Sequence, residues 1–532
     1  MPVATGAVTQ SDGTEALNAV LEQSKYGNVP WYKNPGVRYL NIVLIVALVS
    51  SANNGYDGML MGGIQSLPFW QRYFPDFQTN KSLLGVMVAG QQIGGVFALP
   101  FCPIMAEKAG RRLAIAWGAA IALAGSILQG AANNVGMYIA ARILLGFGVA
   151  FLMNASPLLI TELCYPTSRG AYTSSFNSLW HLGSLLANVT TFSTLNIQSD
   201  NSWRIPGYMQ GVPSAFQLVL VWLIPESPRW LIARGREEDA LKVLGKYHGA
   251  GDENDALVRF EFHEIKEALR LEKELTKDIN MFTPFKGKGN QRRMLVIGAI
   301  AFFSQWSGNA LFSYYQKDVY DTIGITASYD QLLINIFQSL WQIAVSIIAS
   351  LFVDKLGRRT LFLASNIGML VTYVIWTGLN GGWPSESVNG VKVPTIPISA
   401  GRAALAIWFL YNAAYAIAYS PLLVAYTVEI LPYRIRSLGL TWMNFFVNVS
   451  LVFNSYVNPV AFDALAWKYY IVYAVWLVFE LVFVYFFVIE TKGHTLEEIS
   501  VLFDGHTGDV AGSSYDHESG KAAVALPEKV AA

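Results

Sequence analysis

Stretches of about 20 mostly apolar residues recur along the 532-residue chain, and a stretch of that length crosses the hydrocarbon core of a bilayer as a helix. The candidate spans lie near residues 38–61, 84–105, 113–132, 136–160, 172–195, 209–225, 294–316, 331–353, 360–380, 402–428, 438–461 and 469–489. Only 14% of the residues are charged, whereas a soluble chain carries about a quarter. The sequence therefore predicts an all-α membrane protein with twelve transmembrane helices.

The polar segments set the expected domain organisation. We expect an N-terminal tail over residues 1–37, a six-helix half over 38–225, a linker with short amphipathic helices over 226–293, a second six-helix half over 294–489 and a C-terminal tail over 490–532. Lys and Arg are retained on the cytoplasmic side, and the cation-rich loops after even-numbered spans share one side. Both termini and the linker are therefore expected in the cytoplasm. Linker helices lying in lipid headgroups are a weaker alternative, because their glutamates would face anionic lipid.

An internal repeat relates the two halves. Residues 107–112 read EKAGRR after the second span, and residues 354–359 read DKLGRR after the eighth. Two further correspondences join Glu162 and Arg169 with Glu429 and Arg436, and Glu226 and Arg229 with Glu490 and Lys492. Parallel repeats of this kind are related by a pseudo-two-fold axis along the membrane normal.

The repeated charges are candidate conformational latches. Acidic and basic side chains at helix ends can bridge neighbouring helices in one conformation and must separate in another, and several weak pairs together can bias a rocking motion. The alternative is that the cations only fix the topology. The expected gate comprises Glu107, Arg111, Arg112, Glu162, Arg169, Glu226, Arg229, Asp354, Arg358, Arg359, Glu429 and Arg436.

The ordered motifs resemble the sugar porter family of the major facilitator superfamily, over residues 55–498. They are Gly55-Tyr56-Asp57, Gly110-Arg111-Arg112, Arg142, Glu162 with Arg169-Gly170, Pro225-Glu226-Ser227-Pro228-Arg229-Trp230, Gly357-Arg358-Arg359, Glu429 with Arg436, and Glu490-Thr491-Lys492-Gly493. Residues 178–180, 203–206 and 304–309 are more particularly similar to fungal lactose permeases and cellodextrin transporters. The resemblance implies the major facilitator fold, with two pseudo-symmetric six-helix halves.

Asp57 and Arg142 are expected in the middle of the first and fourth spans. A charge at that depth is costly and is usually functional, so the two residues are natural partners. The resemblance implies that Asp57 couples transport to protons, with Arg142 favouring its ionised form. We expect them to be close in one conformation and differently solvated in the other. A permanently paired structural bridge is the alternative, and some facilitators of the family keep the acid.

The resemblance also implies a sugar site near the membrane centre. Buried sugar hydroxyls need hydrogen-bonding partners, which amides supply. The implied contacts are Gln305, Gln342, Asn444 and Asn448, together with Asn177 where relatives carry Gln, and Asn309, which falls one position earlier than the family's Asn. Val424 replaces the family's tryptophan in the tenth span.

These features together predict a secondary active transporter that takes up a disaccharide of the lactose or cellobiose type, or a hexose, with protons across the plasma membrane. A passive sugar or polyol facilitator, a non-transporting sugar sensor and an exporter of a secondary metabolite are the alternatives. No enzyme signature, cofactor, metal site or nucleic-acid partner is indicated, and we expect a functional monomer. Asn80 begins an Asn-Lys-Ser glycosylation sequon in an outer loop.

Overall fold

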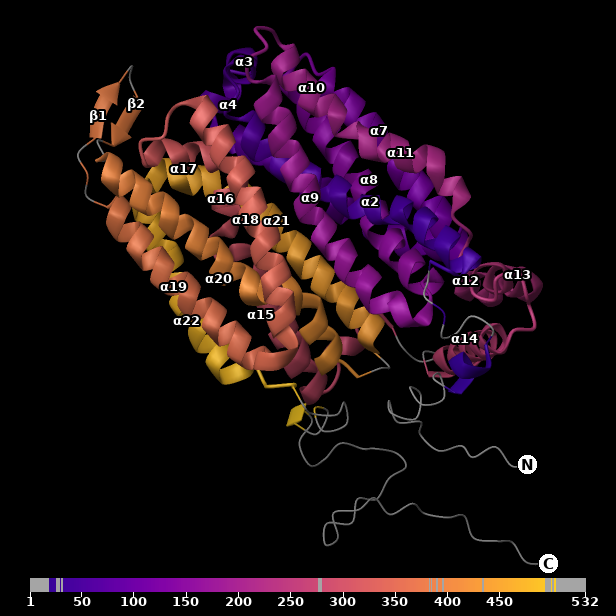
Figure 1. Ribbon diagram of the computed structural model, residues 1–532. Helices are drawn as coiled ribbons and strands as arrows, with labels where there is room; N and C mark the ends of the chain where they lie inside the picture. The colour runs from indigo at the N-terminus through magenta and orange to yellow at the C-terminus, as the bar shows by residue number, and fades with distance from the viewer. Residues whose placement is uncertain are drawn as a thin grey trace, which may run out of the picture.

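The computed structural model describes residues 19–24, 29, 32–275, 280–381, 383, 385–388, 391–394, 397–432, 435–492, 499 and 502–503. Its helices form two bundles, which lie side by side in Figure 1. The first bundle, called the N half, contains α2 (Pro35–Ile64), α3 (Pro68–Tyr73), α4 (Asp76–Thr79), α5 (Lys81–Ala98), α6 (Phe101–Lys108), α7 (Arg111–Gly130), α8 (Val135–Leu163), α9 (Arg169–Thr194), α10 (Asn201–Met209) and α11 (Gly211–Leu220).

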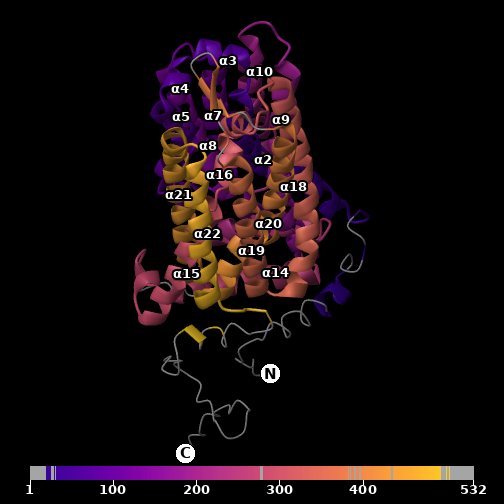
Figure 2. The same cartoon turned by 90° about the vertical axis from the view of Figure 1, so that its left-hand side faces the viewer.

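The second bundle, called the C half, repeats this arrangement. It contains α15 (Lys288–Trp306), α16 (Asn309–Tyr314), α17 (Gln316–Thr322), α18 (Ser328–Leu356), α19 (Arg358–Asn380), α20 (Ile398–Ile430), α21 (Arg436–Leu465) and α22 (Lys468–Phe487). Figure 2 shows its long helices standing nearly parallel. A two-stranded antiparallel hairpin, β1 (Ser385–Val388) with β2 (Val391–Pro394), follows α19 and was not predicted.

The linker between the halves folds into short helices, α12 (Pro228–Ala233), α13 (Glu237–Tyr247) and α14 (Ala256–Leu275). They lie beyond one end of the bundle, which we call the linker end, and the β-hairpin lies at the opposite end, which we call the hairpin end (Figure 1). α12, α13 and α14 pack against one another through apolar side chains that include Leu231, Leu244 and Val258. The linker is therefore a small unit with its own core.

Among the described residues, nine helices are long and apolar enough to cross a membrane, and the bent pair α5 and α6 brings the number to ten. That pair forms one predicted span with a 49° bend, which falls at Pro100, where a proline ring cannot continue the helix hydrogen bonding. The predicted span 294–316 is likewise divided, into α15 and α16. The two remaining predicted spans are occupied by α9 and by α10 with α11. These helices are not among those ten, so the count of twelve stays partly a prediction.

Glycines allow the helices of the N half to approach backbone to backbone. A Cβ atom on Gly55 of α2 would lie 1.9 Å from the carbonyl oxygen of Trp180 in α9, and one on Gly183 of α9 would lie 1.9 Å from that of Ala52. A Cβ on Gly146 of α8 would likewise lie 1.9 Å from the carbonyl oxygen of Gln91 in α5. Small residues at such crossings increase van der Waals contact, which drives helix association in membranes.

Polar contacts join the two halves toward the hairpin end. Lys81 Nζ at the start of α5 lies 3.2 Å from a carboxylate oxygen of Asp318 in α17. Deeper in the bundle, Asn188 Nδ2 in the last third of α9 donates to Ser339 Oγ of α18 at 2.8 Å. α5 begins and α9 ends toward the hairpin end, so these contacts join the two halves on that side of the bundle.

Candidate functional site

A buried acid–base pair lies at the centre of the N half. Asp57 in α2 and Arg142 in α8 are both fully buried, and Arg142 Nη1 donates to Asp57 Oδ1. The same carboxylate oxygen accepts a 2.5 Å hydrogen bond from Gln210 Nε2, in the turn between α10 and α11. Arg142 Nη2 also donates to Gln91 Oε1 at 3.3 Å. The structure thus brings the two predicted coupling residues together, and it adds two amides that sequence reasoning missed.

The second carboxylate oxygen of Asp57 makes no hydrogen bond within the described part of the structure. Among the residues that the structure describes, none hydrogen-bonds to Asp57 Oδ2 or to Arg142 Nε. Removing either partner of a buried pair leaves an uncompensated charge, which is strongly destabilising. Protonating Asp57 would have the same consequence for Arg142, unless the site opened to water.

The helix that carries two predicted sugar contacts is interrupted. α15 ends at Trp306, and α16 begins at Asn309 after Gly308, whose φ of +102° suits a residue without a Cβ. Around this break, Gln305 Nε2 donates to Ser304 Oγ at 3.1 Å and Asn309 Nδ2 donates to the Ser304 carbonyl at 3.3 Å. The structure therefore places Gln305 and Asn309 on the two sides of one break.

Tyrosines of α20 satisfy the carbonyl groups that the break exposes. Tyr411 Oη donates to the carbonyl oxygen of Ser307 at 2.9 Å, and Tyr415 Oη donates to that of Ser304 at 2.6 Å. Buried backbone carbonyls need such partners. The break is thus a supported feature of the C half.

The other predicted sugar contacts are more dispersed. Gln342 Nε2 in α18 donates to Asn412 Oδ1 in α20 at 3.3 Å. In α21, Asn444 is exposed, and Asn448 Nδ2 donates to its carbonyl oxygen at 2.8 Å. The side chain of Asn177 lies outside the described part of the structure. Among the described residues, no hydrogen bond joins Gln342, Asn444 or Asn448 to the α15 break.

A different pair of α21 amides lies at the break. Asn454 Nδ2 donates to the carbonyl oxygen of Gln305 at 2.5 Å, and Asn458 Nδ2 donates to Asn454 Oδ1 at 2.7 Å. The hydroxyl of Tyr473 in α22 donates to Asn458 Oδ1 at 2.5 Å. Sequence reasoning missed these residues, although two asparagines four positions apart inside an apolar run were a visible signal.

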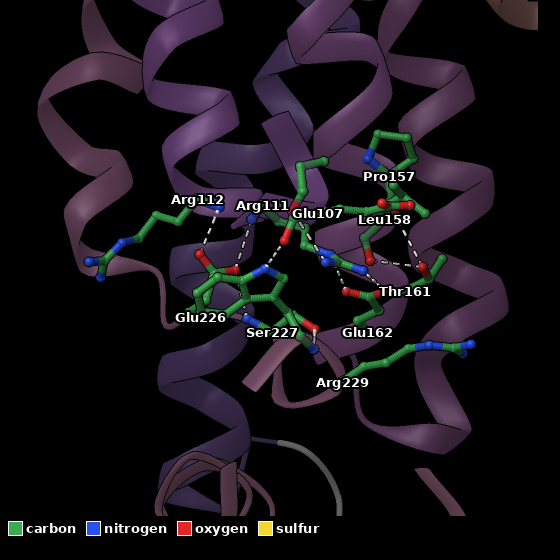
Figure 3. Close-up of polar contacts among 12 residues, drawn as sticks. Glu107, Arg111, Arg112, Pro157, Leu158, Thr161, Glu162, Glu226, Ser227 and Arg229 are labelled. Carbon is green, nitrogen blue, oxygen red and sulfur yellow. Dashed lines mark hydrogen bonds and ion pairs between the residues drawn. The ribbon is translucent and has the colours of Figure 1, made fainter. Parts of the chain in front are cut away.

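At the linker end of the N half, a cluster of predicted gate residues is formed by Arg111, Arg112, Glu162 and Glu226 (Figure 3). Arg111 at the start of α7 makes a two-pronged ion pair with Glu162 of α8, with both N–O distances 3.0 Å. Glu226 accepts the backbone N–H groups of Arg111 and Arg112, each at 3.1 Å. Both Arg111 and Glu226 therefore tie neighbouring segments within a single half.

The C half repeats this cluster with equivalent residues. Arg358 at the start of α19 donates to Glu429 of α20 from Nε at 3.2 Å and from Nη2 at 3.0 Å. Glu490 accepts the backbone N–H groups of Arg358 at 2.8 Å and Arg359 at 3.1 Å. The sequence repeat thus corresponds to a repeat in three dimensions.

The remaining gate residues have other positions. Arg229 donates to Glu272 of α14 at 2.6 Å, and Figure 3 shows its side chain pointing away from Glu226. The Glu107 side chain is exposed, and Arg436 Nη2 donates to the carbonyl oxygen of Leu431 at 3.3 Å. The side chains of Arg169 and Asp354 lie outside the described residues.

The two equivalent glutamates differ in their acidity. Burial raises the pKa of Glu226, despite three backbone N–H donors from Arg111, Arg112 and Ser227. Burial also acts to raise the pKa of Glu490, but this group is more exposed, and four backbone N–H donors hold its pKa below the ordinary value. The ionised form is therefore stabilised by folding at Glu490 but not at Glu226.

We expect the variant Glu490→Gln to lower the apparent melting temperature of the detergent-solubilised protein at pH 7 by on the order of 2 °C. A depressed pKa contributes stability above the unfolded value of about 4.3, and that contribution is lost as the pH falls. The melting difference should therefore shrink below about pH 4. Glu226→Gln is the matched control. Because the pKa of Glu226 is raised, the melting temperature of the wild-type protein relative to this variant should increase as the pH falls. Equal pH profiles would contradict the assignment.

Asn80 is exposed at the hairpin end, where its Oδ1 accepts the N–H of Leu83 at 3.1 Å and caps α5. Its amide nitrogen is thus directed away from the cap.

Among the described residues, no cluster of three His, Cys, Asp or Glu side chains could hold a metal ion.

Comparisons with known proteins all find similarity to transporters. A family model described as "Sugar (and other) transporter" matches residues 43–503. The MFS-type transporter criB of Aspergillus cristatus is 27% identical over 471 residues, covering 88% of this chain and 94% of that protein. The high-affinity glucose transporter 1 of Candida albicans is 28% identical, with coverages of 89% and 87%. The H(+)/hexose cotransporter 2 of Parachlorella kessleri is 27% identical, with coverages of 97% and 95%.

The fold matches a solved transporter structure. The inward-open conformation of the xylose transporter XylE from E. coli superimposes with a TM-score of 0.72 at 24% identity, covering 87% of this chain and 99% of that one. The predicted major facilitator fold is therefore confirmed.

Proposed function

Because this chain belongs to the Sugar (and other) transporter family, we propose that it is a proton-coupled carrier that takes up a hexose or a disaccharide by alternating access. The relative named as an H(+)/hexose cotransporter supports the coupling, since it covers 97% of the chain. A lactose- or cellobiose-type disaccharide is included because of the sequence resemblance described above. The proposal places the protein in the plasma membrane, with the cation-rich linker end in the cytoplasm.

The observation that carries the proposal is the buried pair of Asp57 and Arg142. A charge pair in the bilayer core, with one carboxylate oxygen free, is an expensive arrangement that marks ion pathways and proton relays. In this function Asp57 binds the proton, and Arg142 and Gln210 favour its release. Proton binding removes the charge that holds Arg142, so α2 and α8 can shift relative to each other.

The amides around the α15 break are the proposed sugar contacts. Hydrogen bonds through side chains and backbone carbonyls connect Gln305, Asn309 and Asn454 in one network. Gln342 supplies a further amide from α18. Asn309 Oδ1 and Gln342 Oε1 have no hydrogen-bond partner among the described residues. A sugar hydroxyl would satisfy such acceptors, since a buried polar group without a partner costs about 1–3 kcal/mol.

In this function, the clusters of Arg111 with Glu162 and of Arg358 with Glu429 act at the linker end. Each pair stays inside one half, so we propose that they hold each half rigid while the halves rock.

The energy of one proton is sufficient for accumulation of the sugar. One charge moving down 100 mV releases about 2.3 kcal/mol, and a tenfold gradient costs about 1.4 kcal/mol, so one proton sustains a sugar gradient on the order of 40-fold.

The test is the external pH of lightly buffered yeast cells that express this protein and lack their own uptake systems. Lactose, cellobiose and glucose are added in turn, and we expect one of them to make the medium more alkaline. Labelled sugar that enters without alkalinisation would instead identify a passive facilitator. Binding of a sugar without entry would identify a sensor, and either result would overturn the proposal.

A further inference from the structure

A second buried acid lies in the C half, where no coupling residue was expected. Glu480 of α22 is fully buried, and Ser307 Oγ lies 3.1 Å and 2.9 Å from its two carboxyl oxygens. Among the residues that the structure describes, no Lys, Arg or His pairs with Glu480. An isolated carboxylate in the membrane core would be very costly, so its protonation state must be decided by its hydrogen bonds.

The hydrogen atoms at Ser307 can be counted. A serine hydroxyl carries a single hydrogen. Ser307 Oγ also lies 2.5 Å from the carbonyl oxygen of Phe303, a separation at which two oxygens must share a hydrogen. If the Ser307 hydrogen is donated to Phe303, the contact between Ser307 and Glu480 needs a hydrogen from the carboxyl group. A protonated Glu480 satisfies all three groups at once.

We propose that Glu480 is a second proton-binding site, which holds its proton in this conformation and thereby fixes the break between α15 and α16. The inference deepens the proposed function, on which its part in transport rests. Loss of the proton would turn the Ser307 hydrogen toward the carboxylate and leave the Phe303 carbonyl without its donor. The last turn of α15, which carries Gln305, would then loosen.

The surroundings of Glu480 contain hydroxyl and indole groups. Tyr411, Tyr415 and Tyr419 face it from α20, and Trp476 faces it from one turn earlier in α22. Tyr411 and Tyr415 already donate to the carbonyls of Ser307 and Ser304. These hydroxyls are therefore engaged with the broken helix and do not neutralise Glu480.

The site connects protons with the proposed sugar contacts. Ser307, which bonds to Glu480, lies two residues from Gln305 and two from Asn309. Tyr411 and Tyr415 join the same stretch to α20. A proton on Glu480 thus controls the geometry of the amides that we assign to the sugar.

The first test uses infrared spectroscopy of the purified full-length protein at neutral pH. We expect the carbonyl stretch of a buried, protonated carboxylic acid in the wild-type protein and its loss in Glu480→Gln. Asp57→Asn is the control, because that variant should keep the band. The same spectrum in the wild-type protein and in Glu480→Gln would overturn the proposal. This readout requires no sugar, so it stands even if the proposed function fails.

The second test measures exchange of labelled sugar across proteoliposomes with equal pH on both sides. We expect exchange by the wild-type protein to fall roughly tenfold per pH unit once Glu480 ionises, as for one required proton. Glu480→Gln should lose this dependence, because its amide N–H can donate to Ser307 at every pH. The decline should persist in Asp57→Asn. A decline that persists in Glu480→Gln would refute the role of this residue in exchange.

Discussion

Asp57→Asn is expected to abolish uphill accumulation of sugar while equilibrium exchange of labelled sugar persists. The amide keeps the shape of the carboxylate but cannot gain or lose a proton in the transport cycle. The accumulation ratio should fall from on the order of 40-fold to one, since residue 57 can no longer take up and release the coupled proton. The measurement is the ratio of internal to external sugar in energised vesicles.

Two controls separate loss of coupling from loss of folding. Gln210→Leu removes one donor to Asp57 and keeps the acid, so accumulation should be reduced and not abolished. Arg142→Gln should impair both accumulation and exchange, because it leaves Asp57 buried without its cation. Full accumulation by Asp57→Asn would show that the proton crosses elsewhere.

Gly146→Val is expected to prevent the N half from folding. The new Cβ would lie 1.9 Å from the carbonyl oxygen of Gln91 and 2.7 Å from its Cα, and backbone atoms cannot rotate away. Overpacking typically costs 1–3 kcal/mol where side chains can adjust, and here the whole of α5 must move. The displaced Gln91 also bonds to Arg142, so the coupling pair would be disturbed. The measurement is the yield of monodisperse protein in size-exclusion chromatography.

Gly378→Val is the matched control for this prediction. Gly378 also lies within a long helix, α19, but a Cβ there would meet no atom within 4 Å. Both variants bear the same change in helix propensity, so a difference between them measures the close approach of α5 and α8. Equal yields of the two proteins would contradict the packing argument.

Several parts of the candidate site could be read from the chain because they are local. The charges of Asp57 and Arg142 are conspicuous inside apolar runs, since burial makes unpaired charge costly. The DKLGRR and EKAGRR repeats also place Arg111 and Arg358 at equivalent helix starts. The repeat also places Glu162 and Glu429 at equivalent positions, but only the structure shows that they pair with Arg111 and Arg358.

The sequence by itself therefore determined the membrane class, the two related halves and the two charges that pair in the N half, because apolar length, charge and repetition are properties of neighbouring residues. Only the tertiary structure decided that Asn454 lies at the α15 break, where Asn444 and Asn448 do not. It also brought Glu480 against Ser307, which lies 173 positions earlier in the chain. Such meetings depend on the rotation and depth of packed helices, and one residue of helical phase turns a side chain by about 100°.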